Sequence, residues 1–156
     1  RVVRSTDCGK TWSEPIFVFD AEYYGGDGCW EPSFLQLPSG EVQCYFSVEV
    51  KGNNDQEIMI SRSFDNGLTW GAAERVCYRA GSRDGMATAI VTDAGEIVGI
   101  IEDFGHDNYI GSPRATTFRC TLEDNWSHWV DAGSRNMEMY AGIMALDELP
   151  DRNISR

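Results

Sequence analysis

The stretch SFDNGLTW, residues 63–70, has a near-copy earlier in the chain in STDCGKTW, residues 5–12. Both copies fit the pattern Ser-x-Asp-x-Gly-x-Thr-Trp. In such a pattern the Asp side chain accepts hydrogen bonds from backbone N–H groups ahead of it, Gly takes a positive φ, and Trp packs beneath the corner. The pattern therefore predicts a tight structural turn, carried by Ser5, Asp7, Gly9, Thr11 and Trp12 in the first copy and by Ser63, Asp65, Gly67, Thr69 and Trp70 in the second.

Short strands are predicted on both sides of the second copy. Residues 41–50 alternate between apolar and polar side chains, which is typical of a strand, and residues 33–37 form a second apolar run. The turn residues at 38–40 join these two runs into a hairpin. Two further strands, at 57–62 and 74–78, flank SFDNGLTW, and no segment has a convincing helical period. The sequence thus predicts a unit of four short strands.

The same unit then recurs. The Gly-Glu pair at 40–41 returns at 95–96, after nearly the same interval as the one that separates the two octapeptides. Units of four strands with a period of roughly 40 to 60 residues are typical of β-propeller blades. The second unit comprises predicted strands at 87–91, 96–101 and 115–119 and a degraded copy of the octapeptide at 121–126.

The chain is predicted to be all-β, with residues 1–156 forming one partial propeller domain of about two and a half four-stranded blades. It begins at Arg1, with no initiator Met and no signal peptide, so we expect a fragment of a longer chain. Closing the ring would require the remaining blades of the parent chain or a second copy. The predicted parts are a blade end at 1–20, a full blade at 30–80, a next blade at 85–133 and the start of a further blade at 137–147.

The net charge and the cysteine pattern limit the classes of partner and of metal site that we expect. Lys plus Arg number 13 and Asp plus Glu number 25, giving a net charge of −12, which argues against nucleic acid or an anionic membrane as partner. The five cysteines are widely spaced, with no CxxC or Cys/His pairing, so we expect no zinc site, no other metal and no cofactor. Cys44 belongs to the apolar face of the 41–50 strand and is expected to be a buried small hydrophobic residue.

The octapeptide is identified as the Asp box of the sialidase-type (BNR repeat) propellers, which the sequence resembles over nearly its full length. In that superfamily the box joins the third and fourth strands of a blade on the outer rim, away from the axis. The resemblance implies that Asp7 and Asp65 are structural. The chemistry is therefore expected elsewhere.

In a propeller, the inner strand of each blade starts on the face where the second strand ends, because the two are antiparallel. This filter selects Glu31, at the start of one inner strand, and Glu102, at the end of the second strand of the next blade. Two carboxylates over a concave site are what glycosidic bond cleavage requires. Trp30 is a candidate for stacking on a sugar, and Arg83 and Asp84 for binding its polar groups.

Each of these candidates also has a structural interpretation. A Glu at a strand end is often a solvated rim residue, and an adjacent pair such as Arg83 and Asp84 is often a surface ion pair. Trp30 is equally suited to plugging the central face of a propeller. The joint placement of Glu31 and Glu102 favours the catalytic interpretation.

A closer resemblance rests on the segments 28–41, 82–86 and 95–103, which look like the corresponding parts of the exo-α-1,5-L-arabinanases of glycoside hydrolase family 93. Members of that family are six-bladed propellers that release arabinobiose from linear arabinan with retention, using two glutamates. Glu31 and Glu102 match those glutamates by motif. The resemblance implies an oligosaccharide or polysaccharide substrate and, since such polymers lie outside cells, a secreted protein. Which glutamate is the nucleophile stays open.

Two other functions compete with an arabinan-cleaving glycosidase. A sialidase shares the propeller and the Asp boxes but needs an arginine cluster for the sugar carboxylate and a Tyr/Glu nucleophile pair, and only Arg83 in this stretch is well placed for such a cluster. A non-catalytic BNR module that binds carbohydrate or another protein is the third possibility. Wide separation of Glu31 and Glu102 would favour that module.

Overall fold

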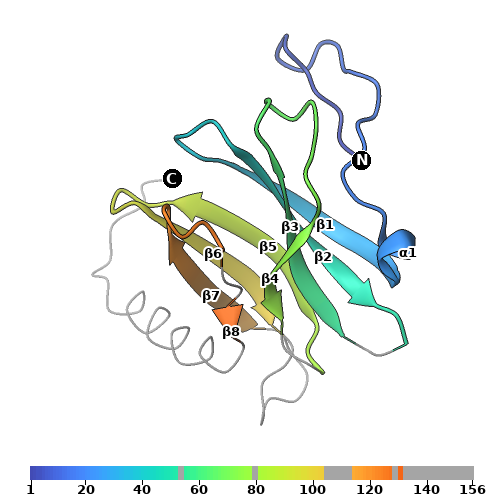
Figure 1. Cartoon of the computed structure of the whole chain (residues 1–156), viewed down its shortest axis with the longest axis vertical. Coiled ribbons are helices and arrows are strands. Elements are labelled where there is room, and N and C mark those ends of the chain that lie inside the picture. Colours follow the sequence, from blue (N-terminus) through green and yellow to red (C-terminus); the bar gives the residue numbers. More distant parts are fainter. Residues whose placement is uncertain (53–54, 79–80, 104–113, 128–129, 132–156) are drawn as a thin grey trace, which may run out of the picture.

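The computed structural model describes residues 1–156 except 53–54, 79–80, 104–113, 128–129 and 132–156. The regular secondary structure of the described part is strand apart from one short helix, and the strands form two neighbouring sheets (Figure 1), which confirms the predicted all-β class. Within it, no helix combines the length and the apolar character that a membrane crossing requires. The elements are α1 (Ala21–Tyr24), β1 (Gly26–Gln36), β2 (Val42–Val50), β3 (Gln56–Ser63), β4 (Glu74–Tyr78), β5 (Asp84–Val91), β6 (Glu96–Asp103), β7 (Arg114–Thr121) and β8 (Val130–Asp131).

The first sheet has the strand order β1-β2-β3-β4, and each neighbouring pair is antiparallel. This is the four-stranded unit that the sequence predicts. Gly40 makes the tight turn between β1 and β2 possible, because its φ of 92° is costly for a residue with a Cβ atom. β1 begins at Gly26, ahead of the predicted start of this blade at residue 30.

The second sheet has the order β5-β6-β7, again antiparallel. Its fourth strand is not beside β7 in the described part of the chain. Instead β8 pairs in parallel with β4 of the first sheet, through Cys77 with Val130. The predicted start of a further blade at 137–147 lies outside the described residues.

A short helix, α1, precedes β1 and was not predicted. The side chain of Asp20 caps it by accepting from the N–H groups of Glu22 and Tyr23, and Gly25 ends it with a φ of 91°. At four residues the helix is too short to produce a 3.6-residue period in the sequence. In the sequence, only the capping residues Asp20 and Gly25 indicate this helix.

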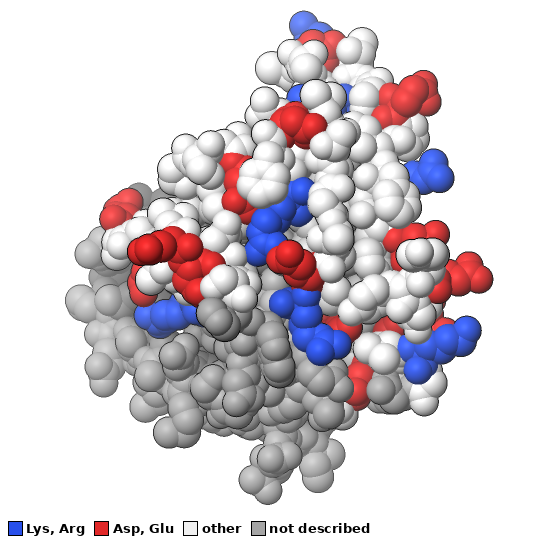
Figure 2. Space-filling view, viewed as in Figure 1, with Lys and Arg blue, Asp and Glu red and all other residues white. Residues whose placement is uncertain are grey.

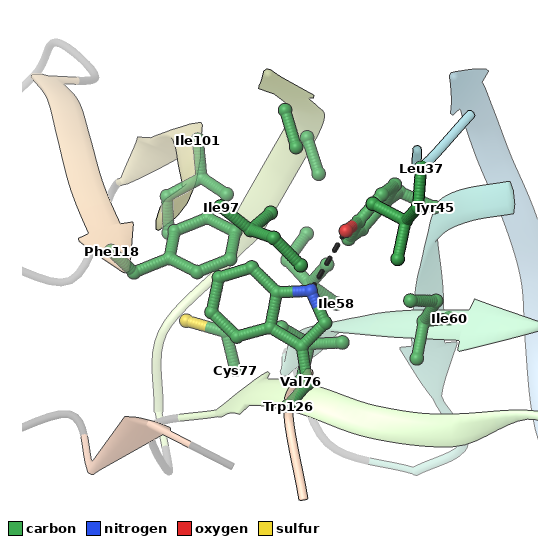
Figure 3. Packing of buried hydrophobic residues seen from close by; sticks show 12 residues of the cluster. Leu37, Tyr45, Ile58, Ile60, Val76, Cys77, Ile97, Ile101, Phe118 and Trp126 are labelled. Atoms are coloured by element: carbon green, nitrogen blue, oxygen red, sulfur yellow. Dashed lines mark hydrogen bonds between the residues drawn. The ribbon is translucent and has the colours of Figure 1, made fainter. Parts of the chain in front are cut away.

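The two sheets share a hydrophobic core (Figure 3). Phe118 and Trp126 pack with ring centroids 5.0 Å apart, and the indole Nε1 of Trp126 donates to the hydroxyl of Tyr45 at 2.8 Å, so the tryptophan of the second unit is fixed to a strand of the first. The cluster contains Leu37, Tyr45, Ile58, Ile60, Val76, Cys77, Ala87, Ala89, Ile97, Ile101, Phe118 and Trp126.

The other face of the first sheet is also buried. Cys44, Phe46 and Val48 lie on this face with Met59 and pack against Phe19. The alternation predicted for residues 41–50 is therefore confirmed, and burial raises the pKa of the Cys44 thiol to about 12, as expected for an inert core residue. Burial on both faces is what a strand stacked between neighbouring blades requires.

The second octapeptide lies between β3 and β4, as the family resemblance implies. The carboxylate of Asp65 accepts from the N–H of Leu68 at 3.0 Å, the N–H of Thr69 at 2.8 Å and the hydroxyl of Thr69 at 2.6 Å. Ser63 Oγ accepts from the N–H of Gly67 at 2.7 Å, and Gly67 has a φ of 80°. These hydrogen bonds, with that of the Thr69 side chain the largest cause, lower the pKa of Asp65 to about 2.

The first octapeptide folds in the same way. Asp7 accepts from the N–H of Thr11 at 2.9 Å and from its hydroxyl at 2.7 Å, and the Thr11 N–H bond is the largest of the causes that lower the pKa of Asp7 to about 2. The turn is the tip of a small hairpin in which Val2 pairs with Ile16. Two copies with the same hydrogen bonds show that the octapeptide specifies a turn.

The degraded copy at 121–126 follows β7 as the intact copy follows β3. The Thr121 hydroxyl accepts from the N–H of Asp124 at 3.0 Å, so part of the turn is kept. The side chain of Asn125 does not bond within this turn but donates to Glu41 at 2.9 Å and accepts from Gln43 at 2.7 Å in the first sheet. This copy therefore joins the two sheets.

We expect Asp65→Asn to lower the thermal stability of the intact protein near neutral pH, because the amide cannot accept from the Thr69 hydroxyl as the carboxylate does. The folded-state pKa of about 2 is below the unfolded value of about 3.9, so this stabilisation is present above about pH 4 and is lost as pH falls towards 2. Melting curves between pH 7 and pH 2 measure it.

Asp93→Asn, at an exposed turn between β5 and β6, is the matched control and should leave the curves unchanged. A destabilisation by Asp65→Asn that is as large at pH 2 as at pH 7 would contradict the assignment of the effect to the carboxylate.

Candidate active site

Glu31 occupies a β-bulge within β1. Trp30 pairs with Ser47 and Ser33 with Tyr45, so two residues of β1, Glu31 and Pro32, stand opposite a single residue of β2. The φ of Glu31 is 57°, in the left-handed region that residues with a side chain seldom adopt. Bulges and strained backbone of this kind re-aim side chains at functional sites. The prediction placed Glu31 at the start of the inner strand, whereas it lies in the middle of β1, because β1 begins earlier.

The inner strand of the second sheet carries the same bulge. Met86 and Ala87 stand between the pairs formed by Gly85 and by Thr88, and the φ of Met86 is 51°. Met86 follows Glu31 by the same interval that separates the Gly-Glu pair at 40–41 from the pair at 95–96. The bulge is therefore a repeated feature of the blades, and a glutamate occupies it in only one of the two.

The two bulges meet across the boundary between the sheets. The strands β1 and β5 lie side by side, and the N–H of Met86 donates to Glu31 Oε2 at 2.7 Å. The hydroxyl of Ser47 reaches the same oxygen at 3.4 Å. Ser33 Oγ also donates to the carbonyl of Ala87 at 2.5 Å. Glu31 is thus an exposed carboxylate held in one orientation by a backbone amide of the neighbouring blade.

Glu102 lies at the end of β6, as predicted, and pairs with Gly85 in the adjacent strand β5. A Cβ atom built on Gly85 would lie 3.1 Å from Glu31 Oε2 and 3.6 Å from Glu102 Oε2. Because both oxygens are this close to one point, their separation cannot exceed the sum of these two distances. The structure therefore brings the two predicted glutamates together, in front of Gly85.

The backbone conformation at Gly85 does not require a glycine. Its φ is not in the positive, left-handed region, so a residue with a side chain could adopt the same backbone. The atoms nearest to its missing Cβ are the tips of Glu31, Gln56 and Glu102, and not backbone or core atoms. The missing side chain leaves room for the ends of Glu31, Gln56 and Glu102. We call this space, with the three side-chain ends around it, the cradle.

Gln56, the first residue of β3, is the member of the cradle that the sequence did not suggest. Its Nε2 lies 3.2 Å from the Cβ position of Gly85 and donates to the carbonyl of Asp84 at 3.1 Å. Gln56 pairs with Glu49 near the end of β2, so it stands at the edge where second strands end. Extending the search to the start of each third strand would have included it.

Trp30 is half exposed, and its position is fixed from two sides. A Cβ atom on Gly28 would come within 2.6 Å of the indole, so the ring lies over that glycine. The indole Nε1 donates to Glu49 Oε2 at 3.2 Å, and Arg83 donates to Glu49 Oε1 at 2.5 Å. The Arg83 hydrogen bond is the largest cause that lowers the pKa of Glu49. Trp30 is thus an exposed aromatic surface, and Arg83 is engaged by protein groups.

Asp84 does not face the cradle. It has no solvent-exposed surface, and its carboxylate accepts from the hydroxyl of Ser82 at 3.0 Å. Successive strand residues point to opposite faces, so Asp84 points away from the side on which Gly85 opens. The prediction that Asp84 binds substrate is therefore corrected: its position in the strand makes it a buried structural residue.

The surface charges are mixed on the face of the molecule that Figure 2 shows. On the face seen in Figure 2, Lys and Arg side chains lie beside Asp and Glu side chains and do not gather in a patch of their own. Among the described residues, no group of three or more His, Cys, Asp and Glu side chains is arranged to hold a metal ion. The chemistry available at the cradle is that of two carboxylates and an amide.

Comparison with known proteins supports the fold. No family model matches the chain and no curated protein matches it. Among solved structures, it is similar to an α-L-arabinanase of Penicillium chrysogenum complexed with arabinobiose, with a TM-score of 0.58 and 22% identity over 76% of this chain and 35% of that one. It is also similar to the family 93 α-L-arabinofuranosidase of Fusarium graminearum with arabinobiose, with a TM-score of 0.58 and 18% identity over 78% and 36%.

A Hadza microbial sialidase is a further structural neighbour, with a TM-score of 0.53 and 17% identity over 64% of this chain and 25% of that one. These similarities show that the described sheets are part of a sialidase-like β-propeller, as predicted. The chain spans about a third of the length of the arabinanase and arabinofuranosidase structures.

We expect substitutions of Gly85 to impair the site while the fold persists. Ala at this position requires the ends of Glu31 and Gln56 to move by a fraction of an ångström, and Val requires more. The activity that the cradle supports should fall about tenfold or more for Gly85→Ala and further for Gly85→Val, since small misplacements of reacting groups are costly. Turnover and melting temperature of the intact protein should be measured together.

Gly99→Ala is the matched control in the same sheet, because its Cβ would collide with the ring of Phe118 in the core. It should lower the melting temperature and leave turnover of the folded fraction unchanged. If the Gly85 variants lose stability and activity in the proportion that Gly99→Ala does, the cradle is not a functional space.

Proposed function

We propose that this chain is the part of a retaining, exo-acting glycoside hydrolase that holds its catalytic carboxylates, and that the substrate is an arabinan-type plant polysaccharide. The observation that carries the proposal is the convergence of Glu31 and Glu102 in front of Gly85, where their Oε2 atoms lie 3.1 and 3.6 Å from one point. Retaining glycosidases hold their carboxyl groups about 5 to 5.5 Å apart and inverting ones about 6.5 to 9.5 Å. The two distances set only an upper limit on the separation of these two oxygens, and the retaining spacing lies within that limit.

The hydrogen bonds of the two glutamates favour different roles. Glu31 Oε2 accepts from the N–H of Met86 and from Ser47, which fixes the carboxylate and leaves Oε1 to attack the sugar carbon. No described residue donates a hydrogen bond to the side-chain carboxylate of Glu102, which suits a group that must release and recover a proton. We therefore assign Glu31 as the nucleophile and Glu102 as the acid/base.

The reaction then has two steps. Glu31 forms a bond to C1 of the sugar while the bond from C1 to the leaving oxygen breaks, and Glu102 gives that oxygen its proton. In the second step water attacks C1, Glu102 takes a proton from the water, and the bond to Glu31 breaks. Two inversions at C1 give net retention. Trp30 offers the half-exposed ring on which a sugar would stack.

Arabinan is the substrate class that the structural neighbours support, since an arabinanase and an arabinofuranosidase among them are complexed with arabinobiose. A polymer of this kind is met outside cells, so the parent protein would be secreted. The other blades of the parent chain, or a second copy, would complete the substrate groove.

A sialidase is the second candidate, because one structural neighbour is a sialidase. It would need arginines available to the sugar carboxylate. Arg83, the one candidate in the predicted site, donates to Glu49 at 2.5 Å and to Gln56 at 2.9 Å. An acidic sugar would have to displace Glu49 from this ion pair, so the neutral arabinan is favoured.

Glu31→Gln and Glu102→Gln should each lower kcat on linear α-1,5-arabinan by about 10²- to 10⁴-fold or more, with the melting temperature nearly unchanged. The measurement is release of arabinobiose by the full-length protein, with a sialyl-lactoside as the competing substrate. Glu123→Gln, at an exposed turn after β7, is the control and should keep full activity. Full activity in both site variants would rule out the proposed function.

Azide separates the two roles in the alanine variants. With an aryl glycoside that has a good leaving group, azide should rescue Glu31→Ala and give a product of inverted configuration, because it attacks C1 in place of the nucleophile. It should rescue Glu102→Ala with retained configuration, because it attacks the glycosyl-enzyme in place of activated water. The reverse pattern would exchange the roles.

A further inference from the structure

Gln56 is a buried amide whose orientation is fixed by its neighbours. Only 7% of the residue is exposed, although it lies at the edge of the cradle. Arg83 NH2 lies 2.9 Å from its Oε1. A guanidinium only donates hydrogen bonds, so the oxygen of the amide must face Arg83 and the nitrogen must face the cradle. The ion pair with Glu49 keeps Arg83 in this place.

One N–H of the amide is left for a ligand. Gln56 Nε2 carries two hydrogens, and the carbonyl of Asp84 accepts one of them at 3.1 Å. No described residue accepts the other. The same nitrogen lies 3.2 Å from the Cβ position of Gly85, the point on which Glu31 and Glu102 also converge. A buried N–H without an acceptor costs free energy, and a ligand that accepts a hydrogen bond from it would remove this cost.

The donor and the aromatic surface are held by one carboxylate. Glu49 binds the indole of Trp30 through Oε2 and the guanidinium of Arg83 through Oε1. Trp30 and Gln56 therefore keep a fixed relation to each other and to the two glutamates. Such a connected set suits a sugar that stacks on one group while its hydroxyls are read by another.

We propose that Gln56 is a third catalytic residue of this site, which donates a hydrogen bond to the hydroxyl on C2, next to the reacting carbon, and that Arg83 is a positioning residue that acts through it. The inference rests on the proposed glycosidase function and extends it. The N–H of Gln56 holds the hydroxyl oxygen and so directs the hydroxyl proton towards the carboxylate of Glu31, which converges on the same point. The hydrogen bond that the hydroxyl then donates to Glu31 strengthens as the transition state develops positive charge at C1, because that charge makes the hydroxyl a better donor. It therefore contributes more to kcat than to KM.

Gln56→Glu tests the donor. The carboxylate keeps the shape of the side chain and the acceptor for Arg83 but cannot donate at neutral pH. In the full-length protein, kcat/KM on an aryl arabinobioside should fall about 10²- to 10³-fold, mainly in kcat. On the 2-deoxy analogue of the reacting sugar, parent and variant should differ by less than about threefold, because the hydroxyl is missing from both.

Arg83 variants test the positioning. Arg83→Met should lower kcat/KM about tenfold, because the Gln56 amide can then rotate and exchange the positions of Oε1 and Nε2. Arg83→Lys should recover much of the loss, because an ammonium, like a guanidinium, can only donate to Oε1. Gln43→Glu is the matched control, a buried glutamine in the neighbouring strand that bonds to Glu41 and Asn125. It should lower the melting temperature and leave kcat of the folded protein and the preference for the 2-hydroxyl unchanged.

The outcomes separate this inference from the function on which it rests. A parent protein inert on arabinan and on the aryl arabinobioside would overturn both. A parent that is active, with Gln56→Glu equally impaired on the 2-hydroxy and 2-deoxy substrates, would overturn the assignment of Gln56 and keep that of Glu31 and Glu102. Melting curves of each variant show whether a loss arises from unfolding.

Discussion

The hydrogen bond from the Met86 N–H to Glu31 Oε2 joins the two blades at the point on which the site depends. It exists because β1 and β5 each bulge at the same level and lie side by side. The bulge in β5 turns an amide away from its own sheet, and the bulge in β1 turns a carboxylate towards it. Removing either bulge would restore strand pairing within one sheet and separate the groups of the cradle. The shared core around Phe118 and Trp126 holds the two sheets in the register that this contact requires.

Repetition supplies the scaffold, and departures from repetition supply the candidate chemistry. Position by position, Glu31 in one blade corresponds to Met86 in the next, and Trp30 corresponds to Gly85. The backbone is the same in both places, but the side chains provide a carboxylate and an aromatic surface in one blade and an opening in the other. A fold of this kind hosts many functions, so the function must be argued from the residues that break the repeat.

Much of the fold was accessible from the sequence, because strand alternation and the octapeptide are local signals. The joint placement of Glu31 and Glu102 followed from topology alone. Gln56 was missed because the search covered the starts of inner strands and the ends of second strands, whereas Gln56 begins the third strand. Its contact with Arg83 joins two blades, and no local sequence pattern indicates such a contact. Asp84 was misplaced because strand alternation around the β5 bulge decides which of two adjacent residues faces the site.

The charges around the cradle limit which ligand it can accept. The positive charge of Arg83 is bound by Glu49, so the two glutamates of the cradle are not offset by an available cation from the predicted site. An anionic sugar entering this space would meet two carboxylates, and the like charges would disfavour that contact. A neutral sugar meets no such repulsion and can use the same carboxylates as hydrogen-bond acceptors. Under the proposed function, the ion pair that orients Gln56 would also disfavour acidic substrates, because it occupies the positive charge of Arg83.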